Sequence, residues 1–252
     1  MALHDDEVAR YQREGFLKVP QVLTPAEVAE GLEEATAMLR RQDTLRWPSE
    51  AGVVMDWVAS PELESRILRR LVLHPVITAI AERLAGRPLR LFKSELLRKA
   101  QVGSAATPLH ADEGALPIDG APVTLTAWVA LVDVPEPRGC MTFWPGTHQL
   151  ALPEAAEALD THSEVAFRPR VTVPLRAGDC TFHDARTLHA AHANTTDVTR
   201  ISLATVYMDA EAAFDPERFV DYGEGMTDAL SHHLKTLGAG QPLASERFPR
   251  LR

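Results

Sequence analysis

The chain has 252 residues, of which 45% are hydrophobic and 24% charged, a composition typical of a globular protein with a sizeable core. Its net charge of −9 argues against nucleic acid or an anionic membrane as the main partner. The sequence begins without the basic-then-apolar pattern of a secretion signal, and no apolar run approaches the ~20 residues of a membrane span. We therefore expect a cytoplasmic protein, either a monomer or a homodimer.

The first part of the chain, about residues 1–88, is predicted to be mostly helical. A capping box with proline at the first helical position begins one helix at Thr24-Pro25-Ala26-Glu27. Ser60-Pro61 begins a second helix, and Pro75 begins a third that ends at Gly86.

Short strand-like runs follow from about residue 89 to 210, including RLFKSELLRK, VTLTAWVALVDV, CMTFWPG, RVTVPL and RISLATVYM. Turn sequences such as PEPRG and NTTD separate them, and this pattern favours a sandwich or barrel over alternating strands and helices. Residues 180–189 and 199–208 are predicted to pair as a hairpin. The remainder, 211–252, is predicted to be a helical tail, and the whole chain 1–252 to be one domain.

A histidine and an aspartate lie one residue apart in TPLHADEG, residues 107–114. Pro108 disfavours a helix here, and in a strand residues two apart point to the same face. His110 and Asp112 are therefore expected to project side by side. One imidazole and one carboxylate on one face make two thirds of a facial metal triad, although this short pattern alone is weak.

Three histidines are candidates for the third ligand. His183 and His189 share strand parity, but six residues of regular strand separate them by roughly 20 Å, so both can reach one metal only if the strand breaks between them. His192 lies in or near the following turn. Periodicity alone leaves His189 and His192 as rivals, with His183 as a further candidate.

Arg200 opens the next strand, and Ser202 follows on the same face. A guanidinium can bind a carboxylate through two parallel hydrogen bonds. Near a metal, an arginine therefore suits a dicarboxylate that chelates the metal with its other end.

Several motifs together resemble one known family. HAD at 110–112, AWVALVDVPEPRGCMTFWPGTH at 127–148 and GDCTFHDARTLHAAHANTTDVTRISL at 178–203 look like the phytanoyl-CoA dioxygenase family, and so does REGFLKVPQVLTPAEV near the start. The likeness spans about residues 11–208. It implies a double-stranded β-helix, a mainly β jelly roll of the cupin type, with the N-terminal helices packed on one sheet.

The resemblance also implies a set of site residues. His110, Asp112 and His189 match the family's iron ligands, and Arg200, eleven residues after His189, matches its 2-oxoglutarate arginine. The family positions near 2-oxoglutarate correspond to Thr107, Trp128 and Ser202, and Thr126 shares the face of Trp128. The implied cofactors are Fe(II) and the co-substrates 2-oxoglutarate and O₂.

The implied activity is that of a non-haem Fe(II)/2-oxoglutarate-dependent dioxygenase that removes hydrogen from an unactivated C–H bond and releases succinate and CO₂. Because Asp112 supplies a carboxylate where related halogenases have a small residue, hydroxylation is expected rather than halogenation. Cyclisation, epimerisation and desaturation start from the same abstraction and remain alternatives. A further alternative is a cupin-like hydrolase or isomerase that does not use 2-oxoglutarate.

The expected substrate is a small apolar or aromatic metabolite, such as a bacterial natural-product intermediate. The segments 113–123 and 149–170, predicted to border the pocket, contain apolar residues and few basic ones. This composition argues against a CoA thioester, whose phosphates favour lysine or arginine. Trp57 is a candidate for the pocket entrance, and His192 for a substrate contact.

Overall fold

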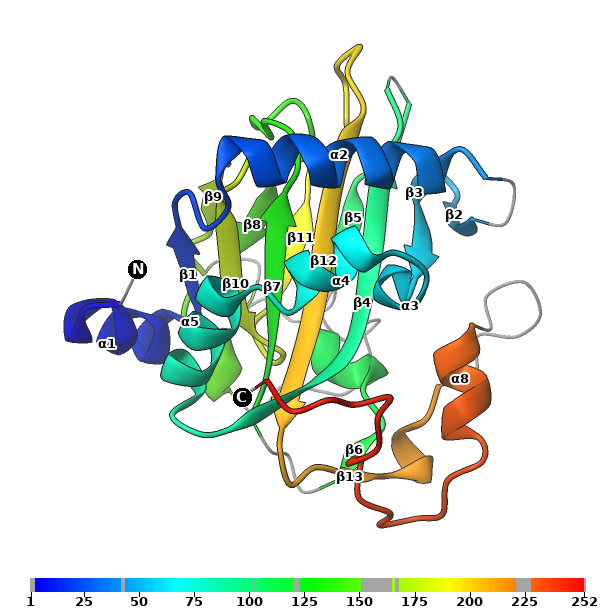
Figure 1. Ribbon diagram of the computed structural model, residues 1–252. Coiled ribbons are helices and arrows are strands. Elements are labelled where there is room, and N and C mark those ends of the chain that lie inside the picture. The colour runs from blue at the N-terminus through cyan, green and yellow to red at the C-terminus, as the bar shows by residue number, and fades with distance from the viewer. Residues whose placement is uncertain are drawn as a thin grey trace.

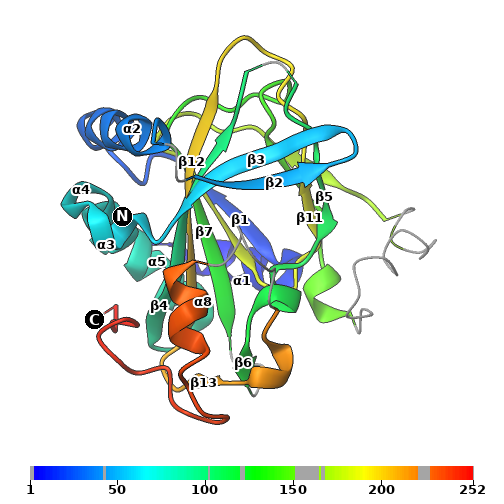
Figure 2. The same ribbon diagram turned by 90° about the vertical axis from the view of Figure 1, so that its right-hand side faces the viewer.

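A computed structural model describes residues 3–41, 44–101, 103–119, 123–150, 165, 168–220 and 228–251. Two antiparallel sheets face each other and helices cover the outer side of the larger one (Figures 1 and 2). The larger sheet contains, in spatial order, β1 (Phe16–Val19), β10 (Cys180–Asp184), β7 (Thr124–Ala130), β12 (Arg200–Asp209), β4 (Leu89–Lys99), β3 (Gly52–Ala59) and β2 (Leu45–Ser49). The smaller contains β5 (Thr107–His110), β11 (His189–Ala191), β8 (Met141–Phe143) and β9 (Val171–Val173). This arrangement confirms the predicted double-stranded β-helix.

The helices lie mainly in the N-terminal third of the chain, as predicted. They are α1 (Asp5–Glu14), α2 (Pro25–Leu39), α3 (Pro61–Glu64), α4 (Arg66–Val72) and α5 (Pro75–Ala85). The capping box at the start of α2 is present, because Thr24 Oγ1 accepts from the Glu27 amide and the Glu27 carboxylate accepts from the Thr24 amide at 2.8 Å. α5 ends at Gly86, whose φ of 67° suits a residue without Cβ.

Alternation along the central strands separates the core from the interior between the sheets. In β7, Leu125, Ala127 and Val129 point outward and pack in the hydrophobic cluster that includes α2, α4 and α5. Thr126 and Trp128 point the other way, into the space between the two sheets. The inward positions of this sheet therefore line the interior cavity, whereas the outward apolar positions pack against the helices.

The structure corrects three expectations about element boundaries. The first 88 residues contain β1, β2 and β3 as well as helices. The predicted hairpin of 180–189 with 199–208 is wrong, because the chain leaves the large sheet after Asp184, joins the small sheet at His189, and returns as β12 between β4 and β7. The described part of the tail contains one short helix, α8 (Ala229–Leu234), and the 3₁₀ turn η3 (Pro216–Arg218). It also contains the strand β13 (Ala213–Phe214), which pairs with β6 (Ile118–Asp119). The other 3₁₀ turns are η1 (Asp112–Ala115) and η2 (Thr147–Gln149).

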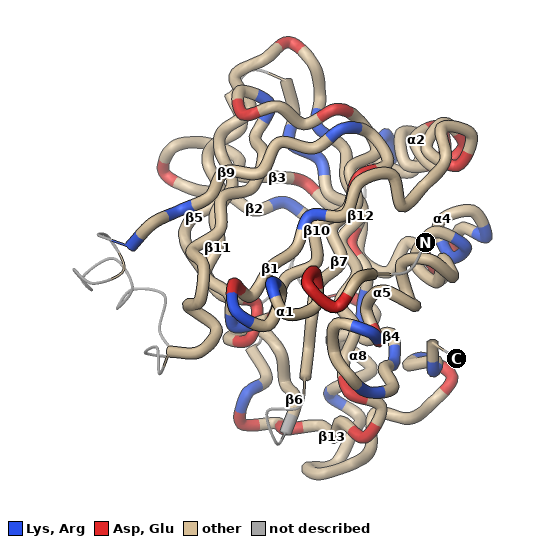
Figure 3. The backbone as a smooth tube through the Cα atoms, turned by 90° about the vertical axis from the view of Figure 1, so that its left-hand side faces the viewer, with Lys and Arg blue, Asp and Glu red and all other residues tan. Residues whose placement is uncertain are grey.

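The surface is mixed in charge. On the side viewed in Figure 3, acidic and basic residues are interspersed along the backbone. Among the described residues, no helix has both the length and the apolar character needed to cross a membrane.

Candidate metal centre and co-substrate pocket

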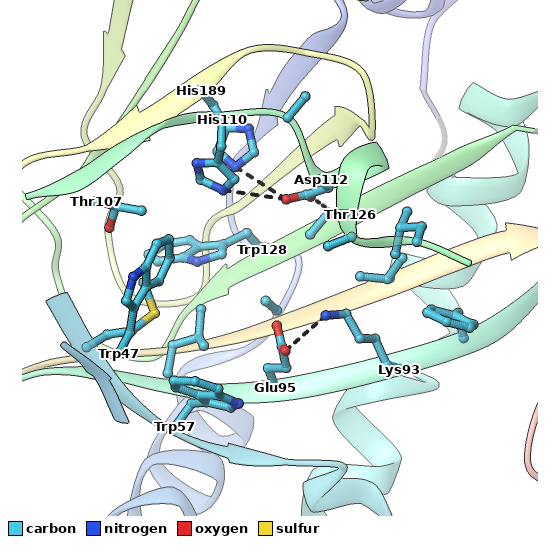
Figure 4. Close-up of a pocket in the computed structure, with 18 of the residues that line it drawn as sticks. Trp47, Trp57, Lys93, Glu95, Thr107, His110, Asp112, Thr126, Trp128 and His189 are labelled. Atoms are coloured by element: carbon cyan, nitrogen blue, oxygen red, sulfur yellow. Dashed lines mark hydrogen bonds and ion pairs between the residues drawn. The ribbon is translucent and has the colours of Figure 1, made fainter. Parts of the chain in front are cut away.

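A cavity of about 420 Å³ opens between the two sheets, and polar residues gather at one end of it (Figure 4). His110, Asp112 and His189 lie there, on or beside two strands of the small sheet. His110 and His189 are directly opposite each other in the paired strands β5 and β11, and their ring centroids are 4.2 Å apart. Strand pairing therefore brings together two side chains that are 79 positions apart in the sequence.

Asp112 completes this cluster from just beyond the end of a strand. β5 ends at His110, but Ala111 keeps an extended backbone, so Asp112 still projects to the same side as His110 at the start of η1. Its Oδ1 lies 3.7 Å from His110 Nε2 and 3.6 Å from His189 Nε2. The three residues each offer one donor atom within 4.8 Å of the others. Two imidazoles and a carboxylate on one side are the donor set of a facial iron triad.

The protonation states suit a divalent cation. Burial, and secondarily the neighbouring His189, lower the pKa of His110 to about 4, and burial also lowers the pKa of His189. For Asp112, burial alone would raise the pKa, but the nearby His189, His183 and His110 hold it well below its usual value. At neutral pH the cluster therefore offers two neutral imidazoles and an ionised carboxylate, which is the form that binds metal.

A fourth polar group, His183, also reaches this cluster, because β10 ends at Asp184 and the chain breaks its regular strand before His189. The His183 Nε2 lies 3.2 Å from Asp112 Oδ2, and Thr126 Oγ1 donates a hydrogen bond of 2.7 Å to the same oxygen. Thr126, which the sequence places on the face of Trp128, lines the same cavity as Trp128 and also contacts Asp112. His192 faces Thr142, with its Nε2 3.1 Å from the Thr142 hydroxyl, and does not line the cavity.

Arg200 lies farther along the same cavity. It is 1% exposed, its guanidinium carbon sits 5.2 Å from the centre of the Trp128 ring, and its Nη1 donates to the carbonyl of Gly139 at 2.7 Å. Gly139 has φ of 82°, and a Cβ there would lie 2.7 Å from the His192 carbonyl oxygen. Glycine is therefore required where the backbone holds this arginine.

The polar atoms around Arg200 are incompletely satisfied in a way that fits 2-oxoglutarate. Within the described part of the chain, the buried Nε of Arg200 and the buried hydroxyls of Thr107 and Ser202 have no hydrogen-bond partner. Lys99, opposite Arg200 in the neighbouring strand, is 0% exposed and donates to the Ala105 carbonyl at 2.5 Å. Neither basic side chain is paired with a carboxylate among the described residues, and Arg200, which lines the cavity, forms a site that a ligand's carboxylate would neutralise.

The rest of the cavity is largely apolar, with one charged pair. The β2–β3 hairpin contributes Trp47 and Trp57 to the cavity lining, and the place of Trp57 at its entrance stays a prediction. On the inner face of β4, Lys93 Nζ and the Glu95 carboxylate form an ion pair of 3.0 Å that faces the cavity (Figure 4).

Two loops were predicted to border this cavity. From residues 113–123, Ala115, Leu116 and Pro117 line it. Most of 149–170 lies outside the described residues.

The residues that sequence reasoning missed are Trp47, Lys93, Glu95, Lys99, Gly139 and the role of His183. The alternation of charged residues at 93, 95 and 99 in RLFKSELLRK was the available signal, since equal parity places them on one face of a strand.

Comparison with known proteins gives consistent likenesses. A family model described as phytanoyl-CoA dioxygenase (PhyH) matches residues 11–202. The crystal structure of SnoN, a non-haem α-ketoglutarate-dependent epimerase from nogalamycin biosynthesis, is 49% identical with a TM-score of 0.88, and the match covers 98% of each chain. The α-ketoglutarate-dependent carbocyclase SnoK of the same biosynthesis is 38% identical with a TM-score of 0.89, over 99% of this chain and 97% of SnoK. Ectoine dioxygenase of Bordetella parapertussis is 25% identical over 249 residues, which is 86% of this chain and 79% of that protein.

The fold, the donor set and these likenesses define the class of non-haem iron, 2-oxoglutarate-dependent oxygenases with a double-stranded β-helix. Iron and 2-oxoglutarate are the cofactors of this class, and the buried Arg200, whose Nε has no hydrogen-bond partner among the described residues, fits the second of them. Within the class, the chain belongs to the phytanoyl-CoA dioxygenase family.

Proposed function

We propose that this enzyme inverts a stereocentre at a saturated carbon of a polycyclic aromatic natural product of the nogalamycin type. The observation that carries the proposal is the 49% identity to the epimerase SnoN over 98% of both chains, against 38% to the carbocyclase SnoK. A crystal structure of SnoN in complex with Fe³⁺, α-ketoglutarate and nogalamycin RO supports a substrate of that size and chemistry.

In this proposal, His110, Asp112 and His189 hold the iron, and Arg200 holds the far carboxylate of 2-oxoglutarate in the space beside Trp128. When bound, iron with 2-oxoglutarate and oxygen supplies the oxidising power that breaks an unactivated C–H bond. Arg200 fixes the co-substrate's orientation through charge-assisted hydrogen bonds. The unpartnered hydroxyls of Thr107 and Ser202 are further candidate donors to it.

The apolar wall of the cavity binds the substrate and excludes water from it. Trp47 and Trp57 offer flat aromatic surfaces for a fused ring system, and Leu116 and Pro117 border the metal end. Covering the Lys93–Glu95 pair with a purely apolar ligand would remove water from both charges at a cost. The pair therefore favours a substrate whose hydroxyl or amine substituents reach β4.

The stoichiometry distinguishes inversion from its alternatives. Hydroxylation adds one oxygen atom to the substrate, ring closure removes two hydrogen atoms, and inversion leaves the mass unchanged. In inversion, hydrogen leaves one face of the carbon and a different hydrogen is delivered to the other. Two electrons and two protons from a reductant such as ascorbate then balance the conversion of 2-oxoglutarate and oxygen to succinate, CO₂ and water.

The test is anaerobic loading with Fe(II), followed by air, 2-oxoglutarate, ascorbate and nogalamycin-type intermediates, with succinate and product mass measured together. We expect succinate together with a product of unchanged mass and altered chromatographic retention, dependent on His189. In D₂O, a donor that exchanges with solvent would add one deuterium to the product. A product lighter by two hydrogens would instead assign ring closure, and one heavier by an oxygen atom would assign hydroxylation.

A further inference from the structure

Two side chains outside the proposed ligand set converge on a single oxygen of Asp112. His183 and Thr126 are directly opposite each other in the paired strands β10 and β7, and both point into the space between the sheets. Both contact Oδ2, from Thr126 Oγ1 at 2.7 Å and from His183 Nε2 at 3.2 Å. The other oxygen, Oδ1, faces His110 and His189 at 3.7 and 3.6 Å. The two oxygens of one carboxylate are thus in different environments.

We propose that His183 and Thr126 are positioning residues that restrict Asp112 to binding iron through Oδ1 alone. This inference rests on the proposed metal site and adds to it the groups that fix the carboxylate. Hydrogen-bond partners of metal ligands orient the ligand and raise metal affinity in many proteins. Here both such partners come from the large sheet, whereas His110 and His189 belong to the small one.

The contact with a carboxylate determines the tautomer of His183. An ionised carboxylate only accepts hydrogen bonds, so His183 Nε2 must carry the proton. Its Nδ1 is buried and has no partner among the described residues. The ring is held between Phe143 and His189, with centroid distances of 5.4 and 4.6 Å. Because the Nε2 of His183 donates to Asp112, it has no free lone pair for a metal. This explains why His183, a third buried imidazole, lies close to the cluster but is not a proposed ligand.

Two donors on Oδ2 also bear on the number of open coordination positions. A carboxylate oxygen has about two lone-pair sites, and Thr126 and His183 occupy both on Oδ2. For Asp112 to bind a metal through both oxygens, these hydrogen bonds would have to break. A one-oxygen Asp112 with His110 and His189 leaves three of six positions open, which a bidentate co-substrate and oxygen require.

The experiment measures metal binding rather than turnover. Wild type, Thr126→Val, Thr126→Ser and His183→Phe are titrated anaerobically with Fe(II) in the presence of 2-oxoglutarate, following the visible absorption of the iron–2-oxoglutarate chelate. Co(II) absorption spectra of the same proteins report coordination number and geometry. Thermal melting of the metal-free proteins identifies any variant that does not fold. Thr181→Val is the matched control, because Thr181 lies on the same face of β10 and its buried hydroxyl has no partner among the described residues.

We expect Thr126→Val and His183→Phe to weaken Fe(II) binding by about 10- to 100-fold and to change the Co(II) spectrum. Thr126→Ser, which keeps the donor, and Thr181→Val should stay within about twofold of wild type. Wild-type affinity and an unchanged spectrum in folded Thr126→Val would overturn the proposal, even if His183→Phe does not fold. His189→Ala tests the proposed metal site separately from the positioning residues. If this variant binds Fe(II) as wild type does, the proposed metal site itself is wrong.

Discussion

Lys99 has an ammonium group that the fold removes from water without pairing it with a carboxylate in the described part of the chain. The residue is 0% exposed, and Arg200 is its cross-strand partner. Burial, with a smaller contribution from the Arg200 charge, lowers the pKa of Lys99 from 10.5 to about 7. This shift makes the stability of the protein without 2-oxoglutarate depend on pH in a defined direction.

The folded-state pKa lies below the unfolded one, so between about pH 7 and 10.5 the unfolded chain binds a proton that the folded chain does not. Stability therefore rises with pH across this window, whereas below pH 7 the full cost of the buried charge is present. At about 1.4 kcal/mol per pH unit the whole window corresponds to roughly 5 kcal/mol, and the interval from pH 7 to 9 to roughly 2–3 kcal/mol.

Lys99→Met removes this dependence. We expect the variant's free energy of unfolding, relative to wild type, to fall by roughly 2–3 kcal/mol between pH 7 and 9, because only wild type gains stability there. Urea unfolding without metal or 2-oxoglutarate, followed by tryptophan fluorescence at several pH values, measures it. Lys99→Arg is the control. Because arginine keeps its charge throughout this pH range, the free energy of unfolding of this variant, relative to wild type, should also fall as pH rises. A Lys99→Met difference that stays constant from pH 7 to 9 would refute the reasoning.

Three further substitutions test other parts of the structure. Arg200→Ala should weaken 2-oxoglutarate binding about 10- to 150-fold, the equivalent of roughly 1.5–3 kcal/mol for hydrogen bonds to a charged group, and unchanged affinity in an anaerobic iron(II) titration would contradict its role. Gly139→Ala should lower the free energy of unfolding in urea by roughly 1–3 kcal/mol, because Gly139 has φ of 82° and the added Cβ would lie 2.7 Å from the His192 carbonyl oxygen. An unchanged free energy of unfolding would show that this turn can shift freely. Tyr207→Phe should cost about 1–3 kcal/mol, because the buried hydroxyl donates to the Val72 carbonyl at 2.5 Å; a loss well under that range would mean that the carbonyl finds another donor.

Local signals were sufficient for the ends of helices α2 and α5, whereas pairing between distant segments limited the prediction of the strands. The capping box at Thr24 and the stop at Gly86 are encoded within a few residues, and both were predicted. The segment Phe16–Val19 is only four residues long, and it forms a strand because it pairs with residues 180–183, far along the sequence. Nothing within its own stretch determines such a partner, so the N-terminal region was predicted to be more helical than it is.

The candidate site divides in the same way. His110 and Asp112 were predicted to project together from their spacing, and this holds even though the strand ends between them. Periodicity does not identify the third ligand among the other histidines. That choice depends on a break in the strand after Asp184, which brings both His183 and His189 to the cluster. The resemblance to a family selected His189 but gave no indication that His183 contacts Asp112.

Alternation in β4 was visible in the sequence, but its meaning was not. Apolar Leu91 and Leu96 face the helices, while Lys93, Glu95 and Lys99 face inward. In a sheet with one wet face, the charged residues would point to solvent. Here both faces are covered, so the polar face marks the interior cavity, and only the second sheet reveals this.

The β2–β3 hairpin forms one wall of the cavity. Trp47 and Trp57 line the cavity against which the proposed substrate packs, and the hairpin joins the large sheet at its edge, through the pairing of residues 56–59 with β4. The proposed iron ligands and Arg200 lie on other segments, although Trp47 packs edge-on against His110 with their ring centroids 6.3 Å apart. Substitutions at Leu45, Met55 or Trp57, which also line the cavity, would therefore change substrate choice during evolution while the iron ligands stay in place, so that related enzymes share one oxidising centre and differ in the molecule they accept.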